Sequence, residues 1–263
     1  MNQDKKELLS FLDNAFQKVG VHNFEFLYLQ ADLRGFGRYL EAFSDKNALF
    51  GAILAPLRSE KHTLIIPTFT YTVAGRFDCL ATPTRVGSLN QWFLQQADEC
   101  KRSEHPLFSV GALGAQNDIV ENIGKDAFGS GSIYERLLTR SAAILHIGRP
   151  VSLGNTMVHH VEQNLGAVYR VHKSFPTLVY RGPQYVGTRY TAFVRRLDVP
   201  GHHFITETER SAALLHKAGL VKEVVMDVPT TNISLYSYVD TVAFYTNLFK
   251  ADPNIFIEKP LQL

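Results

Sequence analysis

His159 and Glu162, three residues apart, are the side chains of this sequence best suited to moving a proton. They lie in GNTMVHHVEQNLG, which runs from residue 154 to residue 166. Residues three apart share one face of a helix, so the carboxylate would lie beside the imidazole and fix its orientation. An imidazole held in this way suits the work of a general base. His160 would point about 100° away and act as a bystander or a supporting group.

The start of the same helix bears on the protonation of His159. Asn155 or Thr156 would cap it, because a short side-chain oxygen there accepts from free backbone amides. The positive end of the helix disfavours imidazolium and keeps His159 neutral. A metal site is a competing interpretation of these residues. Adjacent helical residues diverge, however, and the H-E-x-x-H spacing of zinc sites is absent, so we predict no bound metal.

Four further stretches carry residues that suit ligand binding. IIPTFTY places two threonines directly after a predicted strand, where the carboxyl ends of parallel strands gather ligand-binding loops. RSEHPLFSVGALG has small residues that let backbone amides approach a ligand. AFGSGSIYERL sets glycines before a capped helix, which suits carbonyl or phosphate oxygens, although it lacks a Walker lysine. In ADLRGFGRYL, Arg34, Arg38 and the amides near Gly35 and Gly37 would meet a diphosphate.

The elements that must position these residues alternate between helix and strand. Apolar spacing predicts helices over 6–19, 47–57, 88–99 and 131–141, and buried strands over 24–31, 62–69 and 142–148. Ser88, Ser132 with Glu135, and Thr206 with Glu209 are the expected helix caps. Strand-like segments follow at 175–182 and 188–199, and a last helix is expected near 234–249. The pattern predicts an α/β fold with a central, mostly parallel sheet flanked by helices and an additional antiparallel β region in the C-terminal half.

Composition narrows the classes of function. The chain has 263 residues, is 45% hydrophobic and contains no long linker, so we expect a single domain over residues 1–263. Its net charge of +2 supplies no basic field for nucleic acid. No apolar run is long enough to span a membrane, and we expect a cytoplasmic protein. Cys79 and Cys100 lack zinc or redox spacing and are expected to be reduced thiols.

Taken in chain order, four of these stretches resemble the aminoglycoside 3-N-acetyltransferase family of CoA-dependent acyltransferases. They are IIPTFTY, RSEHPLFSVGALG, FGSGSIYERL and NTMVHHVEQ, and the resemblance extends over residues 24–165. It implies acetyl-CoA as co-substrate and a histidine, His159 here, that deprotonates the acceptor amine, with Glu162 as its partner. Where many members carry His-Ser-Ser-Leu near the end of the first strand, this chain has QADL, from Gln30 to Leu33.

The resemblance also implies roles for the remaining motif residues. Thr68 and Thr70 would lie by the acyl end of the cofactor, and the residues from Ser109 would line its pantetheine. The residues expected to bind the cofactor are Asp32, Arg34, Gly35, Thr68, Thr70, Arg102, Ser103, His105, Ser109, Val110, Gly111, Phe128, Gly129 and Ser132. The residues expected to bind the acceptor are Tyr71, Asn155, Thr156 and His160.

The activity expected is transfer of an acetyl or short acyl group to a primary amine of a sugar in a ternary complex. A site for polycationic aminoglycosides should be acidic, whereas the chain is slightly basic. The sequence therefore favours an amino sugar, such as a nucleotide-linked one in surface polysaccharide synthesis. An aminoglycoside acceptor, with antibiotic resistance as the outcome, is the alternative. The partners are then a small amine and acyl-CoA, and a homodimer is left open.

Two other classes of protein compete with this interpretation. A hydrolase, metal-dependent or using His105 with a serine, would turn over without CoA. A non-catalytic CoA-binding protein would tolerate replacement of His159. The presence of both His159 and Glu162 favours the enzyme.

Overall fold

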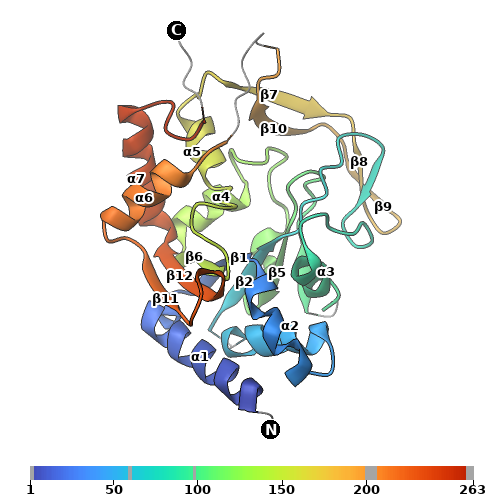
Figure 1. Cartoon of the computed structure of the whole chain (residues 1–263). Helices are drawn as coiled ribbons and strands as arrows, with labels where there is room; N and C mark the ends of the chain where they lie inside the picture. Colours follow the sequence, from blue (N-terminus) through green and yellow to red (C-terminus); the bar gives the residue numbers. More distant parts are fainter. Residues whose placement is uncertain (1–2, 59–60, 97–98, 199–205, 259–263) are drawn as a thin grey trace.

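A seven-stranded sheet forms the centre of the protein in the computed structural model (Figure 1), with strand order β11–β12–β6–β1–β2–β5–β4. The structure describes residues 3–58, 61–96, 99–198 and 206–258. The strands of this sheet are β1 (Phe26–Ala31), β2 (Thr63–Pro67), β4 (Cys100–Arg102), β5 (Val110–Gly114), β6 (Ala142–Ile147), β11 (Lys222–Val225) and β12 (Asn232–Ser237).

The three middle strands of the sheet run parallel, as the alternation of helix and strand predicts. β1 pairs in parallel with β2 on one side and with β6 on the other. The outer strands pair antiparallel: β12 with β6, β11 with β12, β5 with β2 and β4 with β5. The expected α/β class with a helix-flanked central sheet is confirmed. Parallel pairing, which we expected over most of the sheet, is limited to the three middle strands, because the outer strands form two antiparallel pairs, β4 with β5 and β11 with β12, each joined by a short loop.

Helices cover both faces of the sheet, and alternation along β1 assigns its side chains to them. Leu27 and Leu29 belong to the core under α1, α2 and α3, whereas Phe26 and Tyr28 belong to the core shared with α4, α5, α6 and α7. The α-helices are α1 (Gln3–Val19), α2 (Lys46–Leu54), α3 (Ser88–Leu94), α4 (Ile133–Arg136), α5 (Val158–Asn164), α6 (Glu209–Lys217) and α7 (Tyr238–Ala251). None of the helices in the described ranges is both long and apolar enough to cross a lipid bilayer.

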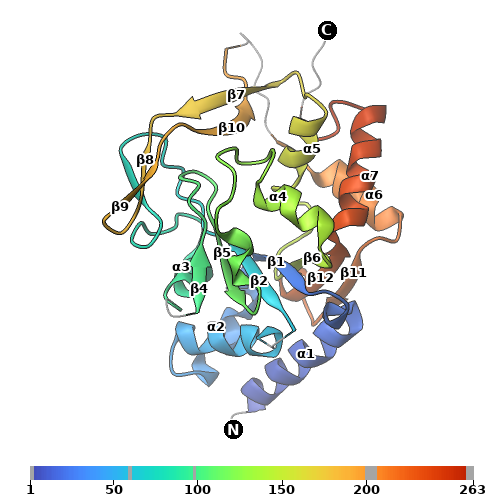
Figure 2. The ribbon, with the colours of Figure 1, turned by 180° about the vertical axis from the view of Figure 1, so that it is seen from behind.

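Two small sheets lie at the end of the molecule far from α1, as Figure 2 shows from behind. One is the antiparallel ribbon of β7 (Arg170–Phe175) and β10 (Tyr190–Arg195). The other joins β3 (Arg76–Asp78), β8 (Leu178–Arg181) and β9 (Gln184–Gly187), with β8 and β9 antiparallel. The additional antiparallel region predicted for the C-terminal half is therefore confirmed.

Helix starts are less well predicted than helix positions. Ser132 caps α4 as expected, because its hydroxyl accepts from the Glu135 amide at 3.3 Å. Ser88 is instead the first residue of α3, after Gly87 at the cap. The box of Thr206 with Glu209 is also wrong: α6 begins at Glu209, and Thr206 pairs with Ile257 in an isolated bridge. The last helix, α7, starts at Tyr238 because 232–237 is strand β12.

The parallel strands place their following loops at one edge of the sheet. β1, β2 and β6 end at Ala31, Pro67 and Ile147. The chain continues from them into a 3₁₀ helix, η2 (Leu33–Ala42), into the loop of Thr68 and Thr70, and into the segment 148–157 that leads to α5. Ligand sites in open α/β sheets form at this edge.

Candidate active site

His159 lies in the first turn of α5, beside the buried carboxylate that its spacing predicts. Its Nδ1 donates to Glu162 Oε2 at 2.6 Å, and 18% of the imidazole side chain is exposed. Nε2 makes no hydrogen bond to another residue in the part of the chain that the structure describes. The tautomer with the proton on Nδ1 leaves Nε2 with a free lone pair, which is the arrangement that a general base needs.

Glu162 is completely buried and is held by two neighbours that the sequence did not reveal. Arg170 Nε lies 2.6 Å from Glu162 Oε2, and the Tyr169 hydroxyl donates to Oε1 at 2.9 Å. Burial by itself would raise the pKa of Glu162, but His159, Arg170 and the Tyr169 hydrogen bond lower it below its ordinary value. Glu162 is therefore a carboxylate at neutral pH.

The same surroundings keep His159 neutral. Burial, and then the charge of Arg170, lower the pKa of His159 below its ordinary 6.5, and Glu162 only partly opposes them. The ring packs edge-to-face on Phe128, with 5.2 Å between ring centres. A free imidazole lone pair is thus available at pH 7, as the sequence predicts, but burial and Arg170 are the causes here.

Neither predicted cap of α5 is confirmed. The helix begins at Val158 after Met157, without a side-chain cap. Asn155 Nδ2 donates instead to the Tyr245 hydroxyl on α7 at 3.0 Å, and the Thr156 hydroxyl donates to the Gly154 carbonyl at 3.3 Å. The Asn155 side chain, which the local sequence assigns to the cap, therefore binds a residue that is far away along the chain.

His160 supports the site from behind. It is buried, its Nδ1 donates to the Phe128 carbonyl at 2.6 Å, and its Nε2 accepts from Asn164 Nδ2 at 2.9 Å. Both ring nitrogens are occupied by protein groups, so the expected contact of His160 with an acceptor is corrected to a supporting role. Through the Phe128 carbonyl it fixes the segment that packs on His159.

A cavity of about 360 Å³, which we call the His159 hollow, opens beside the imidazole. Asn155 and Thr156, expected at the acceptor, lie in its wall. Glu207, just before α6, and Glu209, its first residue, give the wall acidic groups. Among its described lining residues there is no lysine or arginine. They are Ser152, Leu153, Gly154, Asn155, Thr156, His159, Thr206, Glu207, Thr208 and Glu209.

A second cavity has a volume of about 420 Å³, and we call it the Arg149 groove. It is bordered by η2, α2, α3 and by Arg149, which lies just after β6. Arg34, Lys46 and Arg149 supply its positive charge, and Asp32 supplies a carboxylate that pairs with Arg34 at 2.5 Å. Asp32 and Arg34 were both expected to bind the cofactor, and both line the groove. No motif in the sequence pointed to Lys46 or Arg149, which reach the groove from separate elements.

Gly35 and Gly37 have different roles from those expected. A Cβ at Gly35 would come within 2.1 Å of the Thr230 carbonyl oxygen, so Gly35 allows η2 to pack against that backbone. A Cβ at Gly37 would meet nothing within 4 Å, and Gly37 lines the groove. The diphosphate contact expected at Gly35 is corrected accordingly: the free surface is at Gly37.

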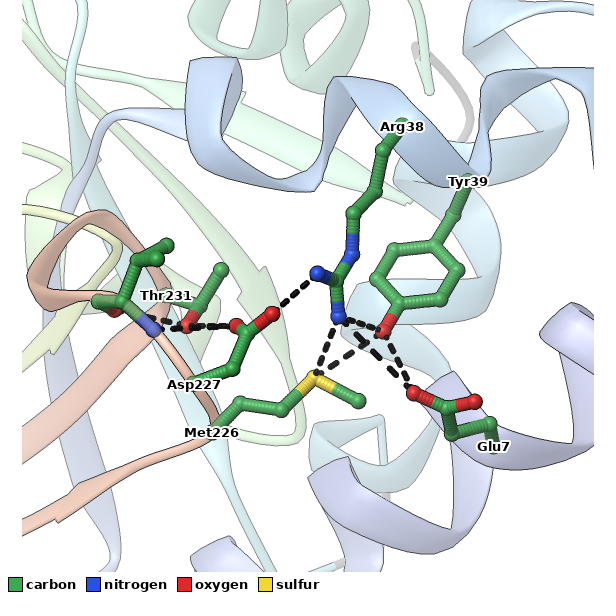
Figure 3. A network of polar contacts seen from close by, with 7 residues as sticks. Glu7, Arg38, Tyr39, Met226, Asp227 and Thr231 are labelled. Carbon is green, nitrogen blue, oxygen red and sulfur yellow. Dashed lines mark hydrogen bonds and ion pairs between the residues drawn. The ribbon is translucent and has the colours of Figure 1, made fainter.

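Arg38 anchors η2 from the side (Figure 3). Its guanidinium pairs with Asp227 and donates to the Tyr39 hydroxyl at 2.5 Å, and that hydroxyl donates to Glu7 at 3.0 Å. The Asp227 carboxylate also accepts from the Thr231 hydroxyl at 3.1 Å. Arg38 is therefore committed to joining η2 with α1 and with the chain after β11.

The threonine and arginine motifs meet in a buried network. Arg102 donates from Nη2 to the Thr68 carbonyl at 2.7 Å and from Nε to the Thr68 and Ser109 hydroxyls, each at 3.2 Å. Ser103 accepts from the Val110 amide at 2.9 Å, and the Thr70 hydroxyl donates to the Pro106 carbonyl. These side chains, with Val110 and Gly111 on β5, bind one another and shape the loop. Their contact with a cofactor stays a prediction.

His105 is equally enclosed. Its Nε2 donates to the Thr191 carbonyl at 3.0 Å, and its Nδ1 accepts from the Phe108 amide at 3.1 Å. Burial lowers its pKa to about 4. With both nitrogens occupied, His105 has no lone pair for a serine, which argues against the His105-dependent hydrolase.

The glycines at 129 and 131 do not form an open cradle. Asp126 Oδ1 accepts from the amides of Phe128 and Gly129 at 3.0 and 2.9 Å. Glu135 accepts from the Gly131 amide at 2.6 Å while Ser132 caps α4. The amides that we expected to face a ligand are thus satisfied by the protein, because acidic side chains nearby compete for them.

Tyr71, expected at the acceptor, is 45% exposed and has a positive φ of 52°. Its ring packs edge-to-face on Phe69 and Phe108, with 5.9 Å between centres in each pair. Burial raises its pKa, and the charge of Arg149 partly opposes this. Tyr71 is therefore exposed enough to contact a ligand. Separately, no three His, Cys, Asp or Glu side chains of the described residues are arranged to hold a metal ion.

Comparison with solved structures shows the class of fold first: it is the fold of aminoglycoside acetyltransferases of known structure. The chain is 21% identical to aminoglycoside acetyltransferase AAC(3)-IVa without ligand, with a TM-score of 0.70, over 96% of this chain and 92% of that one. It is 16% identical to AAC-IIIb in binary complex with CoASH, with a TM-score of 0.71, over 96% and 98%. An AAC(3)-IVa histidine-to-alanine variant in complex with apramycin is 20% identical, with a TM-score of 0.68, over 94% and 93%.

A family model settles the particular family. The model for aminoglycoside 3-N-acetyltransferase matches residues 38–250, so the chain belongs to that family. A search of curated proteins finds no match. The protein is accordingly an acetyl-CoA-dependent N-acetyltransferase, as its motifs predict.

Proposed function

We propose that the protein transfers the acetyl group of acetyl-CoA to an amine of an aminoglycoside or a closely similar cationic amino sugar. The observation that carries the proposal is the position of His159 in the wall of the acidic His159 hollow. Its Nδ1 donates a hydrogen bond to Glu162, and its Nε2 is left free to accept a proton. Glu162 and His159 are the proposed catalytic pair.

His159 Nε2 accepts the proton of the neutral amine as the amine nitrogen bonds to the acetyl carbonyl carbon. The carbon–sulfur bond of the thioester breaks in exchange, and the sulfur keeps the electron pair. Glu162 stabilises the imidazolium that results, and Arg170 and Tyr169 prevent the carboxylate from turning away. Because Glu162 is already fixed, little reorganisation accompanies the proton transfer.

The Arg149 groove suits the anionic part of acetyl-CoA. Arg34, Lys46 and Arg149 are the residues that would hold its phosphates, because guanidinium and ammonium groups are the usual phosphate partners. The bound co-substrate supplies an activated acetyl thioester. The segment from Arg149 to Asn155 borders both cavities, with Arg149 on the groove side and residues 152–155 on the hollow side. Direct transfer then requires the acetyl end of the bound co-substrate to reach past this segment to the amine at His159.

The charge of the hollow changes our view of the acceptor. The preference for a nucleotide-linked sugar rested on the net charge of the whole chain, +2. Locally, Glu207 and Glu209 line the hollow and no described lysine or arginine does. Opposite charges steer and hold a ligand at close range, so the hollow suits a cationic amine. The family and the hollow together favour the aminoglycoside acceptor.

The test is a thiol-release assay with acetyl-CoA and a panel of amines that includes apramycin and nucleotide-linked amino sugars. We expect turnover with the aminoglycosides. His159→Ala should lower kcat by about 10²- to 10⁴-fold while CoA binding, measured by calorimetry, stays within about twofold of wild type. Turnover with nucleotide-linked sugars alone would contradict the proposed acceptor, and an active His159→Ala enzyme would contradict the proposed base.

A further inference from the structure

Arg170, which holds the buried carboxylate of Glu162, is itself held at the wall of the His159 hollow. Its Nη2 donates to the Thr206 hydroxyl at 3.1 Å, and its Nη1 donates to the Phe193 carbonyl at 3.0 Å. Its Nε lies 2.6 Å from Glu162 Oε2. The three nitrogens thus meet three separate parts of the chain: α5, β10 and the segment that leads into α6. Because a guanidinium is planar and rigid, three such contacts fix its orientation as well as its position.

The backbone of Thr206 is fixed independently of Arg170. Thr206 pairs with Ile257 in an isolated antiparallel bridge, and the amide of the following residue donates to the Phe256 carbonyl at 3.0 Å. Both contacts are made with the segment that follows α7. The Thr206 side chain is exposed and lines the His159 hollow. Its hydroxyl therefore holds Arg170 from a wall that another part of the molecule keeps in place.

Loss of the Thr206 hydroxyl would change the surroundings of the catalytic pair. Only 9% of Arg170 is exposed, and one of its N–H groups would be left without its protein acceptor. The guanidinium could then turn about its two remaining contacts, and Glu162 would lose a fixed partner. The charged groups that act on His159 are Arg170, which lowers the pKa of the imidazole, and Glu162, which raises it. Thr206 therefore bears on both members of the pair, although it hydrogen-bonds to neither.

We propose that Thr206 is a positioning residue for acetyl transfer. By holding Arg170, its hydroxyl keeps the Glu162 carboxylate against His159 Nδ1. The inference rests on the proposed function for the reaction that His159 performs. It adds a residue that acts through two others, from the opposite side of the same hollow, and that takes no part in the proton transfer itself.

The experiment compares Thr206→Val, which replaces the hydroxyl by a methyl group, with Thr206→Ser, which keeps the hydroxyl. NMR titration of the His159 ring, in the enzyme without substrates, reports on the surroundings of the catalytic pair. Steady-state kinetics with acetyl-CoA and apramycin report on transfer. Thr139→Val is the matched control, because Thr139 is an exposed threonine just before β6 whose hydroxyl donates to a carbonyl of the preceding turn at 3.2 Å.

Thr206→Val should raise the pKa of His159, because a less firmly held Arg170 disfavours the imidazolium less. It should lower kcat for apramycin about three- to tenfold, the size expected for loss of one hydrogen bond to a charged group, and leave KM for acetyl-CoA within about twofold of wild type. Thr206→Ser should restore the pKa and kcat, and Thr139→Val should change neither.

The outcomes separate this inference from the proposed function. A pKa of His159 that is the same in Thr206→Val and in wild type would overturn the positioning role. A higher KM for apramycin with an unchanged kcat would overturn it too, because Thr206 would then be a contact of the acceptor only. So would a Thr206→Ser enzyme that behaves like Thr206→Val. If the titration shifts as expected but the wild-type enzyme transfers no acetyl group to apramycin, the effect of Thr206 on the pair is supported and the proposed function is contradicted.

Discussion

The surroundings of Glu162 and the Arg149 groove differ in how their charges are held. Glu162 is fully buried and is fixed from His159, Tyr169 and Arg170. In the groove the Arg34 side chain is 90% exposed, and Asp32 is its only ion-pair partner among the described residues. A buried, fully partnered charge has one geometry, whereas an exposed ion pair is worth little and adapts to a ligand. Substitutions around Glu162 should therefore strongly lower activity and stability, whereas substitutions in the groove should be better tolerated.

The largest effect is expected at Glu162. Glu162→Gln should lower kcat on the order of 10²-fold, because a neutral amide no longer stabilises the imidazolium. It should also destabilise the fold by about 3–5 kcal/mol, since Arg170 would be left as an unpaired buried cation. Steady-state kinetics and thermal unfolding measure the two effects.

Tyr169→Phe is the milder matched variant, because it removes one hydrogen bond and keeps the ring. It should cost less than about tenfold in kcat. Equal losses in both variants would contradict a special role of the carboxylate charge.

The pH profile should show a smaller but characteristic change. Burial and Arg170 lower the pKa of His159, so the imidazole is free above that pKa and protonated below it. kcat/KM should therefore fall at acid pH, by about tenfold per pH unit for this group, starting below 6.5. Because Glu162 raises the pKa of His159, Glu162→Gln should move the acid limb to lower pH. The acceptor amine titrates identically in both enzymes, so a limb that does not move would argue against His159 as the base.

The smallest effect is expected in the groove. Arg149→Met should raise KM for acetyl-CoA about three- to tenfold and leave kcat within about twofold, because a cation that only anchors the co-substrate contributes mainly to binding. Arg149→Lys should recover part of the loss. Arg195→Met, an exposed position at the end of β10, is the control. A collapse of kcat in Arg149→Met would show that the groove is as intolerant as the surroundings of Glu162.

The sequence was most informative where the relevant partners are close along the chain. The spacing of His159 and Glu162 predicted their contact, and the spacing of Ser132 and Glu135 predicted the cap of α4. Both could be predicted because helix geometry alone determines the distance between residues three apart. Tyr169 and Arg170 were missed, since only the turn at Gly166 and strand β7 bring them back to Glu162. The cap at Asn155 failed for a similar reason: Tyr245 on α7 is 90 positions away in sequence.

Burial and local charge were also beyond the sequence. Thr68, Arg102 and Ser109 were expected to contact a ligand. Only 4% of Arg102 is exposed, and its guanidinium donates to the Thr68 carbonyl instead. The net charge of +2 suggested a non-cationic acceptor, although the residues around His159 are acidic. An average over the whole chain carries no information about which charges the fold brings to one cavity.

The segment between β6 and α5 has a consequence for the order of events in catalysis. Arg149 Nε donates to the Leu153 carbonyl at 3.1 Å, so the residue that faces the groove is tied to a residue of the His159 hollow. A bound anion that shifts Arg149 in the groove therefore also shifts Leu153 in the wall of the His159 hollow. Each substrate should then alter the affinity for the other by one common factor, whichever is added first.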